Sequence, residues 1–321
     1  MPEFDPQIQT EDIAFKESEL VTCPKCARSN PPNRAECIYC GESLGVTAGT
    51  SARPSIRPME EWELGFNVVA VGGDVGDFSA VAGYLGLESD VASAILGSGR
   101  PLPISRLETS EQAVAVGERL SQYGLQFEIV ADTELILERS PVRLASIEVA
   151  GETIVFTPFS GGESLTVKLS DLQLIVTGLI TNSRLESREK RNRRESKMVA
   201  ETATVADEPM VDIYTADNAV GWRIHFSGFD FSFLGTRKSL VAADNLKRAV
   251  DRLCELSPQV VTDSDYKKLR SVLEAVWPTD TRRESLGMQR VGFGRKEFAN
   301  TATTTNLAQF TKYSRLRRKF L

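Results

Sequence analysis

Histidine is nearly absent from the chain, since His225 is the only one among 321 residues. This excludes a metal site built from several histidines and any mechanism that pairs two of them. His225 lies in an alternating stretch in which Trp222, Ile224 and Phe226 share one face, so we expect it on the opposite, solvated face of a strand. A role as general acid or base is the alternative.

Long apolar runs are also missing. The most apolar stretch, residues 172–180, contains Gln173 and Thr177 and is about half the roughly 20 residues of a membrane-spanning helix. Residues 1–11 carry two prolines and three acids in place of the basic and then apolar segments of a secretory signal. We therefore expect no membrane span and a cytoplasmic location.

A recognisable nucleotide-binding loop is lacking as well. Residues 72–76, Gly-Gly-Asp-Val-Gly, fit neither GxGxxG nor GxxxxGK[ST], so we interpret them as a turn. Positive charge is not in excess either, because 38 basic and 44 acidic residues give a net charge of -6. The surface as a whole is not that of a nucleic-acid binder, and any contact with anions must be local.

Cysteine is scarce but clustered. Four of the five cysteines form two Cys-x-x-Cys pairs, Cys23/Cys26 and Cys37/Cys40, with ten residues between the pairs. Two such pairs can supply four thiolates to a tetrahedral metal ion. A segment this short cannot bury enough apolar surface to fold unaided, so metal binding and folding should be coupled.

With Gly41 after the last cysteine, this segment resembles the short zinc ribbons near the termini of bacterial proteins. The resemblance implies a ribbon over residues 21–42, one structural zinc ion on the four cysteines, and binding to protein or nucleic acid. Two disulfides, four unrelated thiols, or an iron site with the same ligands are the alternatives. We expect residues 1–20 to be disordered and residues 43–61 to be a linker.

Residues 62–138 are expected to form a small α/β domain. Strands are predicted at 66–71, 102–105 and 125–130, and helices at 78–85, 90–96 and from Thr109, which has capping-box spacing to Gln112. This order resembles the C-terminal domain of the ribosomal stalk protein and the similarly folded Clp protease adaptor. The resemblance rests on residues 66–70, 86–89 and 110–114. Stalk domains use lysines around the second helix to dock translation factors, and this chain has Glu88, Ser89 and Asp90 there.

Residues 141–257 are expected to form a β-rich domain, a barrel or orthogonal sandwich, that ends in a helix over 244–256. Seven short strands are predicted, at 143–149, 153–157, 165–169, 172–180, 210–214, 222–227 and 229–234. The aromatic alternation changes parity at Gly228, which predicts a turn or bulge there. Cys254 is interpreted as a packed thiol.

Seven strands closed by a helix are similar to the pleckstrin-homology-like family, with the likeness carried by residues 152–156 and 167–172. The resemblance implies a β domain of a family whose members bind phosphoinositides, peptides or no known ligand. Lipid binders of that family place basic residues in early strand loops, and residues 159–163 contain none. Phosphoinositide binding is therefore not expected.

Basic residues gather in two places. Residues 184–197 hold seven basic and three acidic residues and are expected to be a solvated loop, and residues 279–305 to be irregular. Residues 258–321 are expected to be a helical and basic extension, with a helix over 263–277. Near its end are Lys312, Arg315, Arg317, Arg318 and Lys319, interleaved with aromatic and apolar residues.

Two interpretations of this basic tail remain open. Its cations could contact nucleic acid or an acidic partner. Alternatively, the segment is a helix docked on its own domain with Phe310, Tyr313 and Leu316 inward and the basic residues outward.

Together these patterns predict a multidomain α+β protein. The leading hypothesis for its function is a non-enzymatic, zinc-binding adaptor for an unidentified protein partner. One alternative is association with nucleic acid or the ribosome through the ribbon and the basic tail. Another is an enzyme whose carboxylates are brought together only by folding.

Overall fold

The computed structural model describes residues 20–31, 36–44, 59–60, 63–191, 196–292 and 295–321. The chain divides into two compact units, Met1–Ser55 and Ile56–Leu321. The predictions of a disordered segment at 1–20 and a linker at 43–61 fall almost entirely outside the described residues.

The first unit is small and centred on cysteines. Strands β1 (Val21–Thr22) and β2 (Ser29–Asn30) form an antiparallel pair, and Glu36 bridges to Ser43. Cys23, Cys37 and Leu44 are its buried apolar residues, and Val21 and Cys26 pack against them. So few apolar contacts cannot hold a fold by themselves, as the sequence indicated.

The second unit begins with a three-stranded antiparallel sheet in the order β4-β3-β5. Its elements follow the predicted sequence of strand, two helices, strand, helix and strand: β3 (Phe66–Gly73), α1 (Phe78–Leu85), α2 (Ser89–Leu96), β4 (Leu102–Leu107), α3 (Ser110–Ser121) and β5 (Leu125–Ala131). The Thr109 side chain accepts a hydrogen bond from the Gln112 amide and so caps α3, as its spacing predicted.

A large mixed sheet follows, in the order β13-β14-β9-β10-β11-β6-β7-β8, with β12 also paired to β9. Its strands are β6 (Val142–Ala150), β7 (Thr153–Pro158), β8 (Leu165–Lys168), β9 (Leu172–Arg191), β10 (Ser196–Thr215), β11 (Asn218–His225), β12 (Val261–Asp263), β13 (Asp280–Gly292) and β14 (Arg295–Thr305). The predicted barrel is not closed. Because β9 already pairs with β14 and β12, it cannot also pair with β8.

Both faces of the middle of this sheet are covered by helices. Ile175 of β9 points into a core with α4 (Ala242–Leu256), whereas its neighbours Leu174 and Val176 belong to a second core. That second core contains α5 (Tyr266–Leu273), α6 (Leu307–Lys319) and the whole small sheet. The small sheet and the C-terminal helices therefore share one continuous core.

The region after Trp222 differs in part from the prediction. Gly228 has φ of 77° and lies in a turn, as the parity change indicated. Phe229 and Phe231 are buried in the core, but residues 229–234 are not a strand, because the chain continues into a 3₁₀ helix, Ser232–Arg237. Arg223 and His225 do not form a solvated strand face: Arg223 is buried and His225 half-buried.

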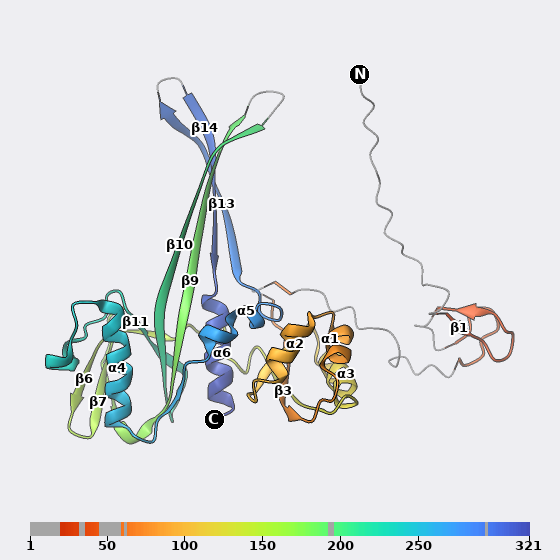
Figure 1. Cartoon of the computed structure of the whole chain (residues 1–321), viewed down its shortest axis with the longest axis horizontal. Helices are drawn as coiled ribbons and strands as arrows, with labels where there is room; N and C mark the ends of the chain where they lie inside the picture. The colour runs from red at the N-terminus through yellow and green to blue at the C-terminus, as the bar shows by residue number, and fades with distance from the viewer. Residues whose placement is uncertain (1–19, 32–35, 45–58, 61–62, 192–195, 293–294) are drawn as a thin grey trace. The chain divides into compact units, whose positions relative to one another are not determined.

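Two long hairpins, β9–β10 and β13–β14, project from the unit (Figure 1). We call this projection the arm and define it as residues 181–191, 196–207, 280–292 and 295–305. The predicted loop at 184–197 and irregular segment at 279–305 are thus mostly strands. Residues 201–207 of β10 are all exposed, so neither face of this part of the strand is buried. Apolar and polar residues therefore need not alternate here, and the sequence carries no strand signal.

No helix in the described parts of the chain has both the length and the apolar character needed to cross a bilayer.

Candidate metal centre

Two similar turns hold the four cysteines. In the first, the amide of Ala27 donates to the carbonyl of Cys23, and in the second the amide of Gly41 donates to the carbonyl of Cys37. The residue after the second cysteine of each pair is left-handed, with φ of 56° at Ala27 and 70° at Gly41. Glycine adopts this conformation without strain, whereas alanine does so at a cost of about 1–2 kcal/mol.

The sulfur atoms converge at one point. Sγ of Cys23 is 3.7 Å from Sγ of Cys40, and Sγ of Cys26 is 3.6 Å from Sγ of Cys37. All four sulfurs lie within 4.8 Å of one another, and the cysteines are free. Ligands at the usual Zn–S bond length of about 2.3 Å in a tetrahedron would be about 3.8 Å apart. The four residues could therefore hold one metal ion.

Hydrogen bonds and burial give Cys37 and Cys40 different pKa values. Burial opposes ionisation of Cys37, but the amides of Tyr39 and Cys40 outweigh it and lower the pKa of Cys37 to about 6. The amide of Glu42 favours the Cys40 thiolate, yet burial and the three neighbouring thiols raise the pKa of Cys40 to about 12. Four thiolates so close together require a cation to balance their charge.

Asn30 connects the two turns. Its Oδ1 accepts from the amide of Ile38 at 2.9 Å, its Nδ2 donates to the carbonyl of Arg28 at 2.9 Å, and its side chain is buried. The sequence does not identify Asn30 as a residue that supports the site. Asn30 and Ile38 are eight residues apart in the chain, and only the folded structure shows that they are hydrogen-bonded.

The second cysteine pair also carries apolar side chains to the surface. Ile38 and Tyr39, between Cys37 and Cys40, are each 53% exposed. The guanidinium of Arg28 lies 4.8 Å from the centre of the Tyr39 ring. A metal ion bound by Cys37 and Cys40 would fix both ends of this short turn and so hold the two side chains on a rigid support.

A serine-hydrolase pattern occurs in the same unit. Residues 41–45, Gly-Glu-Ser-Leu-Gly, match the pattern GxSxG. That motif works on a sharp turn between a strand and a helix. Here Ser43 lies three residues after Cys40 and forms a β-bridge with Glu36, so it belongs to the cysteine site and not to a turn between a strand and a helix.

The five basic residues named in the tail lie on α6. Phe310, Tyr313 and Leu316 are buried, as a docked helix requires, but Lys312 and Arg315 are buried as well. Arg315 donates to the carbonyls of Leu135, Ile136, Arg139 and Val220.

The other three also bind within the unit. Arg317 pairs with Asp263 at 2.8 Å, Arg318 donates to the carbonyl of Ala216, and Lys319 pairs with Glu134 at 2.8 Å. These contacts hold α6 against the rest of the second unit. They also occupy the basic side chains that were expected to contact an external partner.

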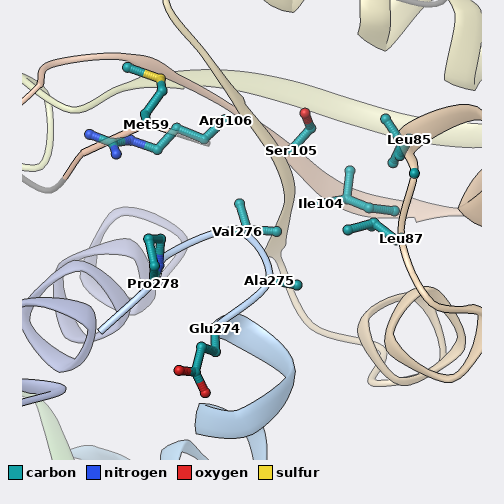
Figure 2. Close-up of a pocket in the computed structure, with 11 residues that line it drawn as sticks. Met59, Leu85, Leu87, Ile104, Ser105, Arg106, Glu274, Ala275, Val276 and Pro278 are labelled. Carbon is teal, nitrogen blue, oxygen red and sulfur yellow. The ribbon is translucent and has the colours of Figure 1, made fainter. Parts of the chain in front are cut away.

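Groups that could serve an enzyme are dispersed in the second unit. A cavity of about 320 Å³ lies between the small sheet and residues 274–278 (Figure 2). Among the described residues that line the cavity, Glu274 is the only one with a carboxylate, and Arg106 is paired with Asp132. Burial, together with the positive charges of Arg143 and Arg223, lowers the pKa of His225 to about 4. Burial raises the pKa of the Cys254 thiol.

Comparison with known proteins finds no matching family model, no similar curated protein and no similar solved structure.

Proposed function

We propose that the protein is a non-enzymatic interaction protein whose N-terminal unit is a ribbon folded around one structural zinc ion. The convergence of four cysteine sulfurs within 4.8 Å carries this proposal. Four protein thiolates fill a tetrahedral zinc site and leave no position for water or substrate, which is the arrangement of structural zinc. Iron could use the same ligands and is the alternative that elemental analysis decides.

The ribbon's exposed Ile38 and Tyr39 are the proposed contact with a protein partner. An apolar and an aromatic side chain that are exposed on a rigid support resemble the anchors of protein interfaces. Neither side chain supplies a ligand to the metal site, so the role of these two residues can be separated from metal binding.

The experiment compares partner capture by three forms of the full chain: wild type, the variant I38S/Y39S and the matched variant V114S/L165S. Val114 and Leu165 are similarly exposed apolar residues in the second unit. Proteins enriched by wild type should be lost with I38S/Y39S, which should keep its metal, and retained with V114S/L165S. Equal capture by all three forms would refute the proposed contact.

The two fold resemblances are retained as hypotheses. The antiparallel order β4-β3-β5 with three helices supports a stalk-like or adaptor-like domain. The run from β6 to β11 followed by α4 supports a pleckstrin-homology-like domain whose sheet stays open. Both families are known for binding partners, which agrees with an adaptor.

A further inference from the structure

A second cavity in the larger unit, which we call the basic cavity, is lined mainly by basic and hydroxyl side chains. It has a volume of about 520 Å³ and lies between the N-terminal half of α6, the base of the arm and residues 137–141. Among the described residues that line it, Arg139, Arg223, Arg282 and Lys312 are cations, and Asp280 alone has a carboxylate.

Positive charge remains in excess when the ion pairs of the basic cavity are counted. Arg223 is bound to Asp212 at 2.6 Å, and Arg282 lies 3.0 Å from the carboxylate in the lining. With Arg139 and Lys312 included, the positive charges outnumber the negative ones by two. A cleft whose charges have mainly one sign concentrates the electric field, so this cavity favours anions in a protein of net charge -6.

Two of these cations lie deep in the unit. Arg223 and Lys312 are only 5% and 4% exposed, and both line the cavity. Arg223 also donates to Oγ1 of Thr311 at 3.0 Å, so its guanidinium is held in place from two sides. Like charges that line one cavity raise each other's energy, and an anion bound between them lowers it.

The N-terminus of α6 adds partial positive charge to the same place. Leu307 and Ala308, the first two residues of the helix, line the basic cavity, and Lys312 follows about one turn later. The N-cap residue, Asn306, makes no side-chain hydrogen bond to the helix. The dipole of the helix therefore supports the side chains in attracting an anion.

The lining fits an organic phosphate better than a carboxylate. A phosphate monoester carries close to two negative charges at pH 7 and has three strong acceptor oxygens, which suits the charge excess and the nearby hydroxyl groups of Thr303 and Thr305. Cavities for small ligands have volumes of about 300–1,000 Å³, so this one has room for more than a phosphate group. Leu137 and Pro141 supply an apolar surface for the rest of the molecule.

We propose that the basic cavity binds a small organic phosphate monoester. Arg139, Arg223 and Lys312 would hold the phosphate beside the first turn of α6, and the organic group would lie against Leu137 and Pro141. This inference does not rest on the ribbon, because all residues of the cavity belong to the second unit.

The test is isothermal titration calorimetry of the full-length protein with phenyl phosphate as the probe, beside inorganic phosphate and benzoate. Phenyl phosphate should bind at one site per chain and more tightly than either of the others. Inorganic phosphate lacks the apolar group, and benzoate carries a single negative charge. The affinity for phenyl phosphate should fall as salt is added, because salt screens the attraction between charges.

The variant R139Q should bind phenyl phosphate at least about tenfold more weakly, through the loss of a hydrogen bond to a charged group. The Arg139 side chain is exposed, and its carbonyl, which accepts from Arg315, is kept in the variant, so R139Q should melt as wild type does. The matched control is R283Q, which removes an exposed arginine of β13 that does not line the cavity and should bind as wild type does.

Three results would overturn the inference. The first is no binding of phenyl phosphate at a concentration of about 1 mM, a weak affinity by ordinary standards. The second is benzoate or inorganic phosphate binding as tightly as phenyl phosphate. The third is equal affinity of R139Q and R283Q for the probe.

Discussion

Arg106 and Asp132 form a buried ion pair in the second unit. Arg106 and Asp132 have side chains that are 2% and 0% exposed, and their closest atoms are 2.5 Å apart. Asp132 also accepts from the amide of Gly65 and from Nδ2 of Asn67, and Asn67 accepts from the indole of Trp277. This network joins the small sheet to the segment that follows α5.

Replacing Asp132 by asparagine should therefore destabilise the second unit. The change leaves Arg106 as a buried charge without its partner, a situation that typically costs about 3–5 kcal/mol. Denaturant unfolding of D132N should show this loss, whereas E152Q, at an exposed position, should unfold as wild type does. A loss below about 1 kcal/mol would mean that solvent reaches the pair.

His225 should make stability depend on pH. Its pKa in the folded protein is lowered to about 4, against about 6.5 in an unfolded chain. Between these values the unfolded chain binds a proton that the folded protein does not, so stability should fall as the pH drops from 6.5 toward 4. Because the side chain is only half-buried, solvent reduces the size of this effect.

The check is denaturant unfolding of wild type and H225Q at pH 7.5 and pH 5. H225Q should lose less stability than wild type on acidification, since glutamine has no proton to bind. An identical loss in both proteins would show that His225 is protonated equally easily in the folded and unfolded states.

At the scale of elements, the docking of α6 on β9 depends on a close approach. A Cβ atom added at Gly178 would lie 2.5 Å from Cε2 of Phe310, and Phe310 is fully buried. Gly178 has no left-handed φ, so its lack of a side chain is needed for packing and not for backbone conformation.

G178A should accordingly lower the free energy of unfolding by about 1–3 kcal/mol through overpacking. G83A is the matched control, because Gly83 of α1 has open space around it and alanine favours a helix by up to about 1 kcal/mol. Adding F310L to G178A should recover part of the loss. If G178A were as stable as wild type, α6 would not lie in the position described.

Elements with one buried face could be predicted from the sequence, and elements without one could not. The strands of the small sheet and helices α1 to α4 follow apolar periodicity, and their predicted bounds agree with the structure to within about two residues. The outer parts of β9, β10, β13 and β14 have polar sequences because much of the arm is exposed. Their strand structure comes from hairpin pairing, which leaves no periodic signal.

At the scale of the whole molecule, the candidate metal centre could be predicted and the arrangement of the second unit could not. Two Cys-x-x-Cys pairs fix four ligands through local spacing. The shared core depends on contacts such as Trp277 with Asn67, which are 210 residues apart in the chain. The open sheet likewise results from β12 and β14 adding to β9 from distant sequence.

The most direct test of this account is the metal content of purified full-length protein, measured by elemental analysis beside the variant C26S/C37S. We expect one zinc ion per chain in wild type and essentially none in the variant. We also expect amide protection in residues 20–31 and 36–44 to disappear when a chelator removes the ion, because this unit lacks an adequate apolar core. Wild-type protein without bound metal, or with Cys23, Cys26, Cys37 and Cys40 joined in disulfides, would contradict the account.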